Sequence, residues 1–115
     1  QLAKRVNRLL ARGVYEFAES RMVYDYRVDH HLARTAADGV WSGMQPNVGA
    51  VQHAAKRYQA DLVLLSSVSG EDMFNADVTI YAVDIRTGQV ESTSTSGDGV
   101  QSATRAILQA VARRR

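Results

Sequence analysis

Apolar and polar residues alternate along residues 76–83, and two further strand-like segments flank that stretch. Residues 60–65 are almost wholly apolar, and residues 89–96 consist mostly of Ser and Thr. An alternating pattern of period two is typical of a strand, and Gly88 supplies the positive φ that a tight turn needs. The pattern predicts three successive strands in an antiparallel meander. The apolar first strand is expected in the centre of the sheet, with both faces covered.

Amphipathic helices are predicted on both sides of this meander. Residues 3–20 carry apolar side chains at three- and four-residue spacing, and Gly13 among them predicts close packing against the sheet. Asp98 followed by Gln101 has the spacing of a capping box and predicts the start of the last helix. Its buried stripe is expected to consist of Val100, Ala103, Thr104, Ile107, Leu108 and Val111.

The segment between the first helix and the meander is predicted to hold a strand and two helices. Residues 22–28 are rich in β-branched and aromatic side chains, and apolar residues repeat every four positions over residues 31–44. Pro46 ends that segment, and Asn47 is a good N-cap for a helix over residues 48–58. A helical crossover between two strands favours parallel pairing, so a mixed sheet is expected.

The whole chain, residues 1–115, is expected to form one α+β domain in which the sheet packs against helices. Its net charge of +2 is too small to argue for a nucleic-acid partner by itself. There is no Cys, which excludes a disulfide framework and a thiolate metal site, and no apolar run reaches the ~18 residues of a membrane span.

Two segments resemble a known family. Residues 58–69 are similar to the alanine-aspartate, apolar strand, serine-serine-valine segment of TolB amino-terminal-like domains. Residues 82–90 look like the valine-aspartate-x-x-threonine-glycine-x-valine hairpin of the same domains. CsgG-like and PelC-like domains of bacterial envelope lipoproteins share this architecture, and the resemblance covers residues 2–111.

The resemblance implies a periplasmic domain that binds other envelope proteins. Such domains act in assembly, transport or export, often tethered to the outer membrane and sometimes assembled as rings. Family domains begin with an apolar strand before the first helix, whereas this chain begins inside or just before that helix. The expectation is that the strand is cut off, is absent or is supplied by another chain. A gap in the sheet is expected to favour self-association through sheet edges, and a tether upstream of residue 1 is compatible with the family pattern.

Candidate metal ligands are His30 and His31 with Asp25 and Asp29. Neighbouring histidines at a helix start point in different directions, and no third ligand is spaced to meet them. Surface or capping roles are therefore the preferred interpretation, and neither a metal nor a cofactor is expected.

A nucleophilic set can be assembled from Ser66 or Ser67 with His53 and Asp61. The serines lie on a predicted strand and lack the glycine-flanked turn that exposes and activates such a nucleophile. No catalytic residue is expected, and the chain is interpreted as non-enzymatic.

Aromatic and basic side chains interleave at Tyr24, Tyr26 and the neighbouring arginines, which is the pattern of a single-strand stacking surface. A half-buried strand explains the same pattern and is preferred, so no nucleic-acid partner is expected. Trp41 and Met44 are interpreted as core or interface residues.

The hypothesis from the sequence is a periplasmic protein-interaction module without enzymatic activity. Its predicted partner-binding residues are Glu71, Asp72, Met73 and Phe74 in the turn between two strands, together with Tyr24 and Tyr26. The first alternative is a cytoplasmic regulatory or scaffold domain of the same architecture. The second is a small hydrolase or a nucleic-acid binder.

Overall fold

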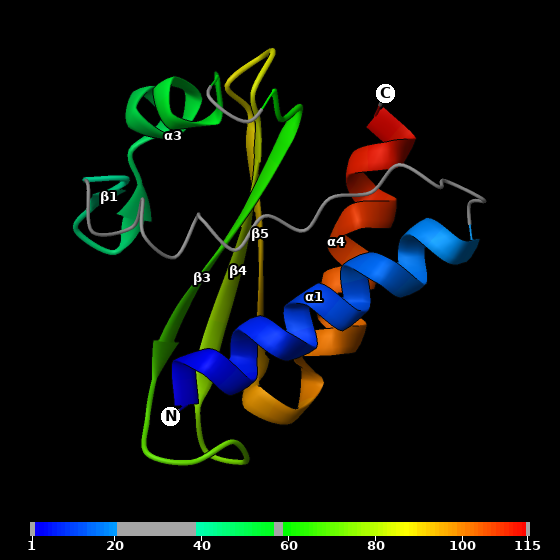
Figure 1. Ribbon diagram of the computed structural model, residues 1–115. Helices are drawn as coiled ribbons and strands as arrows, with labels where there is room; N and C mark the ends of the chain where they lie inside the picture. Colours follow the sequence, from blue (N-terminus) through cyan, green and yellow to red (C-terminus); the bar gives the residue numbers. More distant parts are fainter. Residues whose placement is uncertain (1, 21–38, 57–58, 115) are drawn as a thin grey trace.

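The computed structural model describes residues 2–20, 39–56 and 59–114 (Figure 1). Helices pack on antiparallel sheets, and the expected α+β class is confirmed. In chain order the elements are α1 (Leu2–Ser20), β1 (Trp41–Ser42), β2 (Gln45–Pro46), α3 (Val48–Ala55), β3 (Leu62–Ser69), β4 (Asp77–Asp84), β5 (Val90–Ser96), a 3₁₀ turn (Gly97–Gly99) and α4 (Val100–Arg114).

The main sheet is the predicted antiparallel meander, with strand order β3-β4-β5. Leu65 pairs with Tyr81, and Ile80 pairs with Thr93, in a register that continues without a bulge. In the described part of the sheet β4 lies between β3 and β5. The expectation that residues 60–65 lie in the centre depends on a partner strand outside the described residues and stays a prediction. The strand predicted over residues 22–28, and with it the parallel pairing of a mixed sheet, lies outside the described residues.

Helices α1 and α4 cover one face of the sheet, α1 over β3 and α4 over β4 and β5 (Figure 1). Alternate residues of β4 face this layer, and the apolar stripes of both helices bury them, as the helical periodicity predicts. The resulting core contains Val6, Leu10, Val14, Ala76, Val78, Ile80, Ala82, Val100, Ile107, Leu108 and Val111. Gly13 makes its close approach to α4 and not to the sheet, which corrects the expected packing partner.

A second, smaller core lies on the opposite face of the sheet, under α3. It joins buried side chains of β3, β4 and α3 with one residue that precedes β1, namely Val40, Val51, Ala55, Val63, Leu65 and Val83. The N-cap predicted at Asn47 is confirmed, because its side chain accepts a hydrogen bond from the backbone N–H of Ala50 at 3.2 Å. The apolar β3 is thus covered on both faces, as its sequence predicts.

Residues 39–46 form a turn and the β1–β2 hairpin, so the helix predicted over residues 31–44 is wrong in its described part. Gly39 and Gly43 have φ values of +88° and +63°, which no right-handed helix accommodates. The hairpin rests on β4, where the Tyr81 hydroxyl donates to the carbonyl oxygen of Met44 at 3.0 Å. The Trp41 ring meets Tyr81 edge to face at a centroid distance of 5.8 Å.

The capping box predicted for α4 does not form. A 3₁₀ turn precedes the helix, and the Asp98 carboxylate accepts a hydrogen bond from the hydroxyl of Ser96. The Gln101 side chain donates instead to Glu16 of α1. The side chain that was expected to cap one helix therefore joins two helices.

Candidate functional site

The connection between β3 and β4, residues 70–76, is an ordered loop at one end of the sheet, here called the tip loop. The Asp72 carboxylate organises it by accepting from the backbone N–H groups of Phe74 (3.0 Å) and Asn75 (2.9 Å). The side-chain amide of Asn75 donates to the other carboxylate oxygen at 3.0 Å. An aspartate that holds the backbone two and three residues ahead fixes a turn locally.

The same three hydrogen bonds lower the pKa of Asp72 below the usual aspartate value. The largest contribution comes from the side chain of Asn75, followed by its backbone N–H, and the N–H of Phe74 adds to them. Hydrogen bonds to the charged form favour that form, so the carboxylate is ionised at neutral pH. The turn is therefore held by charge-assisted bonds.

Two glycines allow close backbone contacts at the tip loop, one within the loop and one to the body of the domain. Gly70 has a φ of +125°, and a Cβ there would lie 2.9 Å from the Cα of Ala76. Gly97, at the start of the 3₁₀ turn, is in contact with the backbone of Met73. Met73 itself is half-buried and packs on the core beneath α1 and α4. Met73 consequently ties the loop both to the start of the 3₁₀ turn and to the core.

Phe74, on this anchored backbone, is 78% exposed. Glu71 and Asp72 are exposed beside it, whereas Met73 faces inward and holds the loop in place. The structure thus gathers four of the predicted partner-binding residues in one loop. Tyr24 and Tyr26, the other two, lie outside the described residues.

A second exposed apolar side chain, Met44, lies at the turn of the small hairpin with 76% exposure. Trp41 is half-buried and packs against the core under α3, which agrees with its interpretation from the sequence as a core or interface residue. In the described part of the chain the Tyr81 hydroxyl holds the backbone carbonyl of Met44, whereas three hydrogen bonds to Asp72 hold the tip loop.

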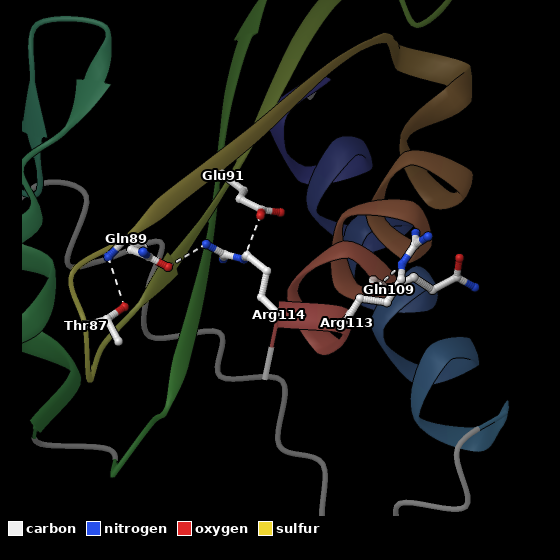
Figure 2. A network of polar contacts seen from close by, with 6 residues as sticks. All are labelled: Thr87, Gln89, Glu91, Gln109, Arg113 and Arg114. Atoms are coloured by element: carbon white, nitrogen blue, oxygen red, sulfur yellow. Dashed lines mark hydrogen bonds and ion pairs between the residues drawn. The ribbon is translucent and has the colours of Figure 1, made fainter.

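A polar network at the other end of the sheet was not predicted from the sequence (Figure 2). Arg114 of α4 forms an ion pair with Glu91 of β5 at 2.7 Å and donates to the side-chain oxygen of Gln89 at 2.7 Å. Arg113 donates to the carbonyl oxygen of Gln109 at 3.4 Å. The two contacts of Arg114 fasten the end of α4 to the start of β5, whereas the Arg113 bond lies within α4.

The nucleophilic set considered for Ser66, Ser67, His53 and Asp61 finds no support in the described geometry. The Ser66 hydroxyl donates to the side-chain oxygen of Asn7 in α1 at 3.2 Å. His53 is exposed on α3, which covers the opposite face of the sheet. Within residues 2–20, 39–56 and 59–114 there is also no group of three or more His, Cys, Asp or Glu side chains placed to hold a metal ion. His30, His31, Asp25 and Asp29 lie outside those ranges.

No helix in the described part of the chain has the length and apolar character needed to cross a membrane. Comparison of the chain with protein-family models, with curated proteins and with solved structures finds no match.

Proposed function

We propose that this chain is a non-enzymatic protein-interaction domain of a bacterial envelope assembly, transport or export system, and that the tip loop is its docking surface. The observation that carries the proposal is Phe74, a large aromatic side chain that is exposed on a backbone held by Asp72, Asn75 and the Met73–Gly97 contact.

The physical reason is preorganisation. Aromatic side chains carry much of the energy of protein interfaces, and their contribution grows when little conformational entropy is lost on binding. Asp72 already accepts hydrogen bonds from the backbone N–H groups of Phe74 and Asn75, and a third from the Asn75 side chain. A partner with an apolar pocket would therefore receive Phe74 without having to order the loop, while Glu71 provides a charged rim.

The cellular setting rests on the resemblance of residues 58–69 and 82–90 to TolB amino-terminal-like domains. That resemblance supports a periplasmic location, with attachment to the outer membrane through a tether. Separation of periplasmic, membrane and cytoplasmic fractions tests it, and recovery in the cytoplasmic fraction would favour a regulatory or scaffold domain instead.

Self-association is a second part of the proposal, and β5 is its best-supported surface. Within the described sheet nothing pairs with the outer edge of β5, which lacks the Lys, Pro or bulge that commonly protects an edge strand. Two copies of Ser94→Lys paired through β5 would bring like charges together, so light scattering should show a smaller mass for this variant than for the wild type. A wild-type chain that remains monomeric at high concentration would remove this part.

Site-specific photo-crosslinking in the native cell tests the tip loop directly. A photoreactive residue at position 74 should yield a discrete cross-linked protein, whereas the same residue at position 44, which is equally exposed, should not. Asp72→Ala should weaken the cross-link by releasing the loop, with the circular dichroism spectrum unchanged. Equal cross-linking at both positions, or none at position 74, would refute docking through the tip loop.

A further inference from the structure

The exposed side of α1 carries four cations, Lys4, Arg5, Arg8 and Arg12. At 3.6 residues per turn they fall within an arc of about 100° around the helix axis and extend over about 12 Å of its length. Within the described residues none of the four forms an ion pair or a side-chain hydrogen bond. This group is called the α1 cationic face below.

Charge is separated between the two layers of the domain. Helices α1 and α4 together contain seven cations and two carboxylates. Residues 60–99, which form the main sheet and its loops, contain seven carboxylates and the single cation Arg86. The field of such a molecule orients its helical layer toward an anionic surface.

We propose that the α1 cationic face binds the anionic headgroups of a phospholipid membrane surface. The cations are spread along an exposed helix and converge on no pocket, so they suit many laterally mobile headgroups better than one phosphate. Clusters of four to eight Lys or Arg residues on a helix are a recognised pattern for anionic lipid. Tyr15, which is 48% exposed and lies three residues after Arg12, suits the headgroup level of a bilayer.

Other anionic partners fit this face less well. A protein interface needs an apolar core within its polar rim. Among the described residues of α1, Tyr15 is the only large hydrophobic side chain that is exposed. Single-stranded nucleic acid needs successive aromatic side chains for base stacking, and the face offers the same single tyrosine. Surface adsorption to lipid requires neither of these features.

Co-sedimentation of the full chain with vesicles tests the proposal. The wild type should bind vesicles of phosphatidylglycerol mixed with phosphatidylcholine, and should not bind vesicles of phosphatidylcholine alone. Raising the salt to about 1 M, where the Debye length is about 3 Å, should release it. Because each cation near an anionic surface strengthens binding about fivefold, Arg8→Gln with Arg12→Gln should weaken partition about twenty- to thirtyfold.

The matched control is Lys56→Gln with Arg86→Gln. It removes the same two charges from exposed residues outside α1 and α4 and should weaken partition no more than about twofold. Equal loss in both double variants, equal binding to neutral vesicles, or no binding to the anionic vesicles would overturn the proposal. So would tighter binding to a single-stranded oligonucleotide than to the vesicles.

The proposal does not depend on the tip loop. Phe74→Ala should bind the anionic vesicles as the wild type does, whatever the result of photo-crosslinking at position 74. Unchanged circular dichroism of the Arg8 and Arg12 variant shows that its loss of vesicle binding does not come from unfolding.

Discussion

Gly13 of α1 lies directly against Thr104 of α4. A Cβ added to Gly13 would come within 2.8 Å of the Cβ of Thr104 and 2.7 Å of the carbonyl oxygen of Gln101. Thr104 is fully buried, and its hydroxyl is turned back to donate to the carbonyl oxygen of Val100 at 2.7 Å. The two helices therefore meet backbone to backbone at this point, and no larger residue fits there.

Gly13→Ala should destabilise the domain although alanine is the better helix former. Overpacking a tight contact typically costs about 1–3 kcal/mol, whereas the gain in helix propensity is at most about 1 kcal/mol. Urea unfolding should show a lower midpoint with an unchanged slope. Gly49→Ala in α3 is the control, because the nearest atom to its Cβ is 3.8 Å away, and it should raise the midpoint. Stabilisation by both changes would contradict the close contact.

Asp84, at the end of β4, holds the turn to β5 through its buried carboxylate. One oxygen accepts from the backbone N–H groups of Arg86 (3.0 Å) and Thr87 (3.3 Å). Asp84→Ala leaves both donors without this acceptor and should lower the free energy of unfolding by about 1–3 kcal/mol. Asp84→Asn keeps an acceptor oxygen and should lose less, as chemical unfolding of the two variants can measure. An equal loss would show that the turn does not depend on this acceptor.

The lowered pKa of Asp72 predicts how stability changes in acid. The pKa of aspartate in the unfolded chain is about 3.9, which is higher than the pKa of Asp72 in the folded domain. The stabilisation is therefore present above the unfolded pKa and is lost as the pH falls through the folded pKa. Unfolding curves of the wild type and Asp72→Asn should therefore differ most near neutral pH and converge in acid. Glu71→Gln removes the same charge from the neighbouring residue and serves as the control. A difference that stays constant with pH would refute the mechanism.

Periodicity in the sequence predicted the elements that bury one side. The stripe of α1, the strands β3 and β4 and the stripe of α4 follow from apolar spacing, because each buries apolar side chains in a core. The polar β5 followed instead from the turn at Gly88 and its Ser and Thr residues. The small hairpin was missed because Val40 and Met44 are spaced as on a helix. The glycines at positions 39 and 43 were the contrary signal, and their positive φ values explain the outcome.

The candidate site was predictable in part. The turn around Glu71 and Asp72 followed from its residue types, and the Asp72–Asn75 spacing was the available signal for the hydrogen bonds that fix it. The inward position of Met73 and its contact with Gly97 depend on how the sheet meets α4. Such a contact between distant segments leaves no local pattern in the sequence.

The contact between Arg114 and Glu91 joins the end of α4 to β5, and its energy should be small (Figure 2). Both side chains are partly exposed, at 34% and 26%, so solvent screens their attraction. A double-mutant cycle with Arg114→Ala and Glu91→Ala should give a coupling energy of about 0.2–1 kcal/mol that decreases with added salt. The pair Arg105 and Glu16, at 3.2 Å and more exposed, should couple more weakly still. A coupling energy well above 1 kcal/mol for Arg114 and Glu91 would contradict the expected screening and mean that the network with Gln89 holds the helix end cooperatively. The same cycle in the Gln89→Ala background should then return the coupling energy to about 0.2–1 kcal/mol.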